Sequence, residues 1–262
     1  MSQATQLPID VRLMNATATA AFAAAGCLLL AAFCWWAVRH PLFGLGGITV
    51  LGDVSHNSAA TLRANVAPQL TGNFFTVDLA ATRRAFEQVP WVRQATVRRE
   101  FPNRLRVVLQ EHQAEAFWGE EGGSWLVNSF GEVFEANVGD VEHDGLPRLA
   151  GPEGQAPLVL AMYRAVAPLF EPLDLSLDEL VLTGRGSWQA VLDTGATLEL
   201  GRGDPAEVVP RVQRFVHTLT QVTARYGRRP EALVSADLRY GDGYALRLRG
   251  VGTVESPAAA GR

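Results

Sequence analysis

The sequence predicts an α+β protein with a single N-terminal transmembrane helix, a βααββ module and a second domain that combines helices with a mixed sheet. Three observations support this fold class. An uncharged apolar run lies near the N-terminus, two helical patterns precede an alternating hairpin, and short strands and turns follow from residue 113 onward. A chain of 262 residues is long enough for one large or two small domains.

The apolar run covers residues 16–38 and contains no charged side chain. As a helix it would be about 35 Å long, enough to cross a hydrocarbon core of about 30 Å. Trp35 and Trp36 stand at its end, where amphipathic rings favour the membrane interface. A cleaved signal peptide is the alternative, but such a peptide has a shorter apolar region and a small-residue cleavage site. We therefore expect a retained anchor, whose orientation stays open because Arg12 and Arg39 flank it almost equally.

The βααββ module begins with a β-rich run that Gly52 ends. Two helical segments follow. The first spans residues 57–70 and has Asn57 or Ser58 as its N-cap, and the second spans residues 76–90 and is ended by Pro90. A hairpin closes the module, with its turn at residues 101–103.

In the last strand of this hairpin the side chains alternate. Leu105, Val107 and Leu109 share one face, while Arg104 and Arg106 share the other. The two helices must cover the apolar face, because a two-stranded hairpin cannot bury it alone. The arginines are then a solvated face, although they could also meet an acidic partner or the acidic stretch that follows Glu111.

The second domain shows strand pairs on either side of turns at residues 124–136 and 187–203, and residues 233–250 form either a last strand pair or one kinked strand. Residues 145–154 are interpreted as a rigid loop. A helix is expected over residues 156–170, interrupted by Pro168, and another from Asp204 as its N-cap to Gly227. Pro210 leaves the start of that second helix open.

Composition and motifs argue against enzymes and nucleic-acid binders. The net charge is −4, and the five histidines stand apart, with no metal-binding or phosphate-binding motif. Both cysteines, Cys27 and Cys34, lie inside the apolar run, so the rest of the chain can form no cysteine-ligated metal site. The aromatics among the hairpin arginines occur at a helix exit and a turn, where packing is more common than base stacking. We expect no catalysis, no cofactor, no metal, no small-molecule substrate and no nucleic acid.

The order of elements and the stretch PWVRQATVRREFPNRLRVVLQE, residues 90–111, resemble a POTRA domain of the FtsQ/DivIB family. LPRLAGPEG, LGRGD and ADLRYGDG follow in that family's order, so the resemblance covers roughly residues 15–250. The domains it implies are a cytoplasmic tail at 1–15, a transmembrane helix at 16–38, a POTRA domain at 45–112, an FtsQ-type β domain at 113–250 and a disordered tail at 251–262.

The resemblance implies a single-pass inner-membrane protein at the division septum, with its N-terminus in the cytoplasm and its bulk in the periplasm. Such proteins are non-enzymatic scaffolds that link early and late divisome components and bind FtsB, FtsL and other divisome membrane proteins. The alternative is a POTRA-type receptor or chaperone in outer-membrane protein transport. Proteins of that kind usually carry several POTRA repeats or a C-terminal barrel, and the sequence contains one repeat and no barrel pattern.

The resemblance also implies that the final strand edge of the second domain binds FtsB. An exposed edge can accept a partner strand, and tyrosine and arginine are enriched where interfaces are strongest. The alternative is that Tyr240 belongs to the core and that the neighbouring glycines only form turns. The residues carried over from the family motif are Arg239, Tyr240, Gly243, Tyr244, Leu248 and Arg185.

Overall fold

The computed structural model describes residues 9–52, 54–141, 145–241 and 243–251. The chain divides into two compact units, residues 1–111 and 112–262. Most of the predicted tails at 1–15 and 251–262 lies outside the described residues. Within the described residues, six short 3-10 helices connect the larger elements: η1 Pro41–Phe43, η2 Ala67–Gln69, η3 Val138–Asp140, η4 Ala167–Leu169, η5 Glu171–Leu173 and η6 Pro230–Ala232.

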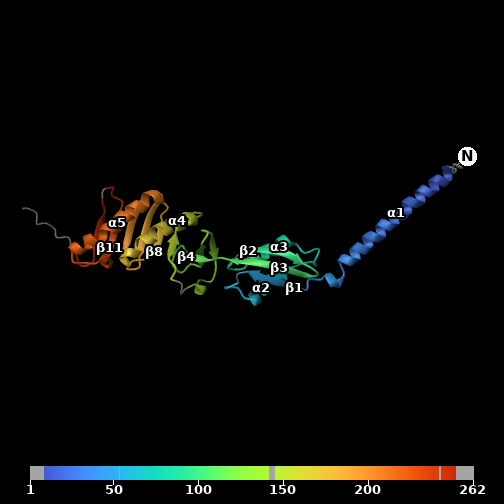
Figure 1. Cartoon of the computed structure of the whole chain (residues 1–262), viewed down its shortest axis with the longest axis horizontal. Helices are drawn as coiled ribbons and strands as arrows, with labels where there is room; N and C mark the ends of the chain where they lie inside the picture. Colours follow the sequence, from blue (N-terminus) through green and yellow to red (C-terminus); the bar gives the residue numbers. More distant parts are fainter. Residues whose placement is uncertain (1–8, 53, 142–144, 242, 252–262) are drawn as a thin grey trace, which may run out of the picture. The chain divides into compact units, whose positions relative to one another are not determined.

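The first unit opens with α1, Ile9–Val38, which Figure 1 shows in blue as one uninterrupted helix. It is long and apolar enough to cross a membrane, and none of its residues is buried by the rest of the protein. It begins seven residues before the predicted apolar run, because residues 9–15 continue the helix with polar side chains among them.

The βααββ module is confirmed by five elements and a three-stranded sheet in the order β1-β3-β2. Strand β1 runs parallel to β3, and β2 runs antiparallel to it. Ser58 caps the first helix, and Asp78 caps the second by accepting the amides of Ala80 and Ala81. The elements are β1 Gly47–Gly52, α2 Ala59–Val66, α3 Leu79–Glu87, β2 Val92–Glu100 and β3 Arg104–Glu111.

The core of this module lies between the helices and one face of the sheet, as the alternation predicted. Leu105, Val107 and Leu109 are all buried, and Val107 and Leu109 pack in a cluster with Phe86 and Leu62 from the two helices. The opposite face exposes arginines, so the prediction of a solvated basic face is confirmed.

The second unit contains a nine-stranded mixed sheet in the order β12-β11-β10-β9-β8-β7-β4-β5-β6. Three neighbouring pairs, β4–β7, β7–β8 and β10–β11, are parallel. The strands are β4 Ala114–Trp118, β5 Trp125–Asn128, β6 Val133–Glu135, β7 Arg148–Ala150, β8 Leu177–Leu182, β9 Ser187–Leu192, β10 Thr197–Arg202, β11 Leu233–Asp237 and β12 Ala245–Leu248.

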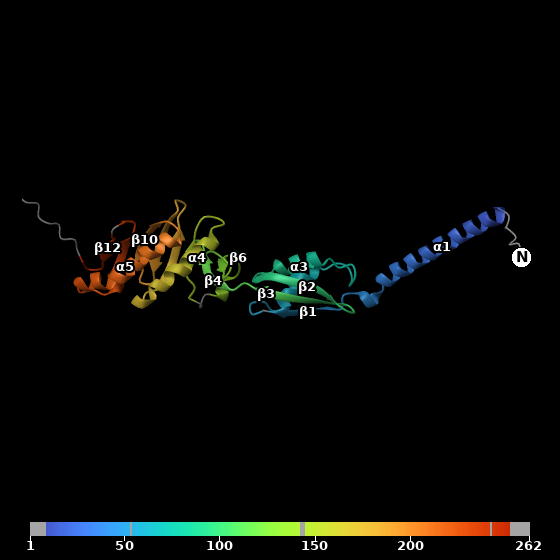
Figure 2. The same ribbon diagram turned by 45° about the horizontal axis from the view of Figure 1, so that its top comes forward.

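Two helices, α4 Ala156–Val166 and α5 Pro205–Arg225, pack against this sheet and against each other (Figure 2). Asp204 caps α5 and Pro205 is its first residue, as expected. The helix continues through Pro210, so the loss of one backbone hydrogen bond near its start does not break it. Its buried stripe includes Val212, Phe215 and Leu219.

The interpretation of residues 145–154 as a rigid loop is wrong, because β7 lies there between β8 and β4 near the middle of the sheet. It escaped detection because it has three residues and only Leu149 is fully buried, with Pro147 and Gly151 on either side. The sequence reasoning also did not identify β4 and β8 as separate strands.

Candidate functional site

Strand β12 forms one end of the nine-stranded sheet and pairs with β11 alone among the described strands. Of the two possibilities for the last segment, the strand pair is therefore correct, and its final strand lies at an edge as the family resemblance implied. Since a backbone at a sheet edge presents unpaired amide and carbonyl groups, this edge can accept another strand. The predicted site residues lie on β12, in the loop before it and in a turn across the sheet.

Tyr240 lies in the loop between β11 and β12 and is 59% exposed. The alternative that it belongs to the core is wrong. Its neighbour Arg239 holds the carboxylate of Asp237, because the arginine Nε and Nη2 donate to Asp237 Oδ1 and Oδ2 at 2.9 and 2.6 Å. This contact is the main reason that the pKa of Asp237 lies below its usual value. Arg239 is thus oriented by a neighbour that stays ionised at neutral pH.

The other three predicted residues near this edge have different surroundings. Tyr244 is half-buried: its ring meets Phe215 edge-on at 4.9 Å, and its hydroxyl lies 2.7 Å from Thr218 Oγ1. Leu248 is buried in the core, so its side chain is not available to a partner. Gly243 has open space where a side chain would begin, since no atom of the other described residues lies within 4 Å of that position.

Arg185 occupies the turn between β8 and β9, and it shares an open groove of about 980 Å³ with Arg239. Two further arginines, Arg202 and Arg211, also line the groove, while Glu199 is its acidic member. The structure thus brings together two predicted site residues that are 54 positions apart (239 − 185). The sequence reasoning missed Arg202 and Arg211, although Arg202 lies within the LGRGD motif that carried the resemblance.

Gly201 explains why this groove can hold several arginines. Its φ of +86° favours glycine. A Cβ there would lie 2.9 Å from Arg211 Nη1 and 3.2 Å from Arg239 Cγ. Arg211 is fixed in turn, because its Nη1 donates to the carbonyl of Leu200. The glycine of the LGRGD motif therefore leaves room for two guanidinium side chains beside the same backbone.

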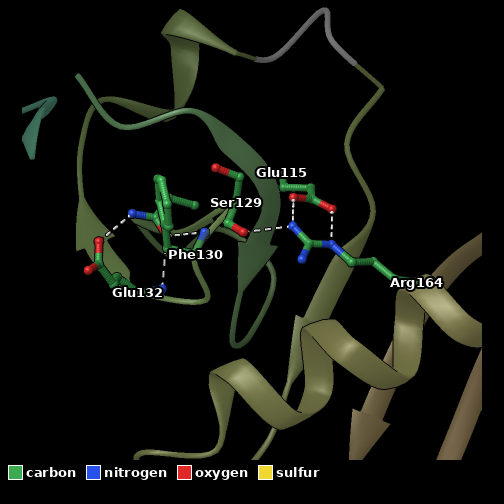
Figure 3. Close-up of polar contacts among 6 residues, drawn as sticks. Glu115, Ser129, Phe130, Glu132 and Arg164 are labelled. Carbon is green, nitrogen blue, oxygen red and sulfur yellow. Dashed lines mark hydrogen bonds and ion pairs between the residues drawn. The ribbon is translucent and has the colours of Figure 1, made fainter. Parts of the chain in front are cut away.

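A separate polar network ties α4 to the strands at the far end of the sheet (Figure 3). Arg164 on α4 donates from Nε and Nη2 to the two carboxylate oxygens of Glu115 on β4, and Nη2 also donates to the carbonyl of Ser129 at 2.7 Å. In the turn between β5 and β6, the side-chain oxygen of Asn128 accepts hydrogen bonds from the amides of Phe130 and Glu132, both at 2.9 Å. These contacts fix a turn and a helix in place. None of their residues lines the arginine groove.

No group of three or more histidine, cysteine or acidic side chains suited to a metal ion occurs among the described residues. The hairpin arginines of the first unit also form no compact site. Arg106 pairs with Glu100 at 2.6 Å, and Arg104 is exposed. Whether this face meets an acidic partner stays a hypothesis.

A POTRA module after one apolar helix, followed by a domain with an open strand edge, defines a membrane-anchored protein of the POTRA class. Residues 43–112 match the family model "POTRA domain, FtsQ-type". Residues 116–239 match "Cell division protein FtsQ/DivIB, C-terminal". The chain belongs to the FtsQ/DivIB family of cell division proteins.

Relatives along nearly the whole chain agree with this assignment. A Cell division protein FtsQ from Burkholderia pseudomallei is 43% identical over 243 residues, which cover 92% of this chain and 94% of the relative. Proteins of the same name from Bordetella pertussis and Thiomonas arsenitoxydans are 42% and 38% identical, and the matches cover 91% and 94% of this chain and 92% and 90% of the two relatives. The role is therefore in cell division, and the outer-membrane transport alternative is not favoured.

Proposed function

We propose that the chain is a non-enzymatic scaffold of the division septum that links early and late division proteins by binding FtsB and FtsL. In this proposal α1 anchors the protein in the inner membrane as a single-pass segment. The N-terminal tail lies in the cytoplasm and both compact units lie in the periplasm. The protein acts through contacts with other membrane proteins of the divisome, and no cofactor or small-molecule substrate takes part.

The observation that carries the proposal is the open edge of β12 beside the arginine-lined groove. A partner strand can pair with the backbone of β12, and main-chain hydrogen bonds then supply affinity without demanding a particular sequence. Side chains next to the edge supply specificity. Tyr240 is the large exposed aromatic in this place, and aromatic residues of this kind often dominate binding energy.

The groove adds a charge requirement to the partner. Arg185, Arg202, Arg211 and Arg239 outnumber Glu199 there, so the groove favours a carboxylate from the bound segment. Arg239 is held by Asp237 and so loses less side-chain freedom on binding than a free arginine would. We infer that an FtsB segment with an acidic residue next to its pairing strand occupies this edge.

A pull-down with the periplasmic segment of FtsB tests the proposal. Arg239→Glu should abolish capture by the full-length chain, because the substitution places a carboxylate opposite the partner's carboxylate. Arg225→Glu is the matched control, since Arg225 is an exposed arginine at the end of α5 and the charge change is the same. If an FtsB variant with an acidic-to-arginine change restores capture by Arg239→Glu, the carboxylate that pairs with Arg239 is identified. Equal capture of FtsB by Arg239→Glu and Arg225→Glu would refute the proposed pairing.

The septal location is tested separately with a fluorescent fusion of the full-length chain. A band at mid-cell in dividing cells is expected. A signal spread evenly around the envelope would contradict the septal assignment even if FtsB binding were intact.

A further inference from the structure

An aromatic cluster lies at the end of the βααββ module where the chain arrives from α1. Phe74 is buried at its centre, and three other phenylalanines surround it. The ring centroids of Phe43 and Phe75 are 4.9 Å apart, those of Phe74 and Phe75 are 5.2 Å apart, and those of Phe74 and Phe101 are 6.3 Å apart. We call Leu42, Phe43, Phe74, Phe75 and Phe101 the juxtamembrane cluster.

The outer members of the juxtamembrane cluster face solvent to an unusual degree. Phe101 is 78% exposed, Leu42 is 71% exposed and Phe75 is 47% exposed. Apolar side chains exposed singly need no explanation, but neighbouring ones indicate a surface that contacts another apolar phase. Nothing in the described part of the chain covers the exposed parts of these three side chains.

Hydrogen bonds connect this cluster to the end of α1. The Asn73 side chain donates to the carbonyl of Val38, the last residue of α1, at 2.6 Å. The amide of Phe74 donates to the carbonyl of Phe43 at 2.9 Å. Phe74 and Phe75 directly follow Asn73 in the chain. Because consecutive Cα atoms are about 3.8 Å apart, the Cα atoms of both phenylalanines lie within about 8 Å of the Cα atom of the residue that contacts the end of α1.

The turn that carries Phe101 lies at the same end. The amide of Gly46 donates to the carbonyl of Asn103 at 2.8 Å, and β1 starts at Gly47 opposite Arg104. Gly46 is only three residues beyond Phe43. Both exposed phenylalanines therefore belong to the part of the module through which the chain enters from the membrane.

The cluster is also built rigidly. Arg99 on β2 donates from Nε to the carbonyl of Phe74 at 2.7 Å and from Nη2 to the carbonyl of Val77 at 2.8 Å. Asn73 Oδ1 accepts the amides of Phe75 and Thr76 at 3.0 and 3.1 Å. Although Arg99 is exposed, its guanidinium holds the loop that presents Phe75. A fixed backbone keeps the phenylalanines exposed.

We propose that the juxtamembrane cluster inserts into the interfacial layer of the lipid bilayer and so holds the POTRA module against the membrane surface. The interfacial layer extends several ångströms beyond the hydrocarbon core on each side and accepts aromatic rings. Trp35 and Trp36 mark the end of the spanning helix, so the cluster starts where that layer begins. Arg98 and Arg104 are exposed near the same turn, which adds attraction to anionic lipid headgroups.

Spin-label accessibility in lipid nanodiscs tests this proposal with the full-length chain. In a background with Cys27→Ala and Cys34→Ala, a nitroxide is attached at Phe101→Cys or at Gln94→Cys. Gln94 is exposed on β2, and the seven residues between it and position 101, in the turn after β2, span about 23 Å of extended chain. The ratio of oxygen to nickel-chelate accessibility should be several-fold higher at position 101 than at position 94. A label on Cys27, with Cys34→Ala, reports whether α1 has inserted.

The outcomes separate clearly. Equal, water-like ratios at positions 101 and 94, with the Cys27 label in hydrocarbon, would overturn the proposal. A Cys27 label in water would overturn both the proposal and the role of α1 as a membrane anchor. Shielding of position 101 only after FtsB and FtsL are added would show a protein surface in place of lipid. Comparing phosphatidylcholine discs with discs of phosphatidylethanolamine and phosphatidylglycerol should give a higher ratio in the anionic discs.

A second measurement keeps the test independent of the label at position 101. With the label at Gln94, the double variant Phe75→Ser/Phe101→Ser should tumble faster in the disc than the parent chain, because the module is released from the bilayer. Unchanged mobility would count against the proposal. The accessibility ratios of the chain alone and the mobility of the Gln94 label involve neither FtsB nor division, so this inference and the proposed scaffold function can fail separately.

Discussion

Tyr240 and Leu248 were both predicted to bind a partner, and their burial now separates them. Tyr240 is 59% exposed, while Leu248 is 4% exposed and packs in the core. A tyrosine can bury at least about 150 Å², so a partner covering its exposed part would remove roughly 100 Å² from water. At about 25 cal/mol per Å², this area contributes about 2.5 kcal/mol to binding.

Tyr240→Ala should therefore weaken FtsB binding by about 2 kcal/mol or more, which is roughly a 30-fold rise in Kd. The free energy of unfolding should change by no more than about 0.5 kcal/mol, as for other surface substitutions. Leu248→Ala should mainly lower the free energy of unfolding, because deleting a buried leucine costs about 2–5 kcal/mol of folding stability.

Calorimetric titration with the periplasmic segment of FtsB, combined with chemical denaturation of the same full-length samples, measures both quantities. An unchanged Kd for Tyr240→Ala would remove this residue from the interface. A loss of folding stability in Tyr240→Ala as large as that in Leu248→Ala would refute the division between exposed and core residues.

Three further changes test the packing inside the first unit and the geometry of the groove. Glu111→Ala should lower the free energy of unfolding by about 3 kcal/mol in denaturant titrations, because this buried carboxylate accepts three contacts between 2.9 and 3.1 Å; exposed Glu121→Ala should be neutral. Asp237→Ala should weaken FtsB binding by freeing Arg239, while a gain in affinity would contradict its positioning role. Because folding lowers the pKa of Asp237, this carboxylate stabilises the folded protein at pH values above its ordinary pKa of 3.8. That contribution is lost as the pH falls through the lower pKa of the folded state, and NMR titration of the carboxyl carbon can follow the loss. Gly201→Ala should destabilise the second unit by about 1–3 kcal/mol, since φ is +86° and an added Cβ would crowd the side chains of Arg211 and Arg239. A thermal unfolding midpoint equal to that of the parent would argue against this strain.

The βααββ module could be predicted because its signals are local. The alternation at Leu105, Val107 and Leu109 gives the buried face, and Ser58 marks a helix start within a few residues. Strand β7 could not be found in this way, because three residues are too few to show a period and its neighbours in the sheet come from distant parts of the chain.

The candidate site could be predicted only in part, because some of its features are local in the sequence and others depend on the tertiary fold. The edge position of β12 and the exposure of Tyr240 agree with the sequence motif. The groove depends on Arg185 and Arg211 arriving beside Arg239 from a turn and a helix, which only the tertiary fold brings about. The role of Leu248 in binding stays a prediction, and alternation along a four-residue strand could not show that its side chain lies in the core.

Hydrogen–deuterium exchange on the full-length chain in nanodiscs, with and without the periplasmic segment of FtsB, tests the central claim most directly. Pairing of a partner strand with β12 should slow exchange of the amides at Ala245–Leu248, where the edge is open in the free protein. Protection confined to the POTRA module, with β12 exchanging at its free rate in the bound state, would contradict the claim that this edge is the partner-binding surface.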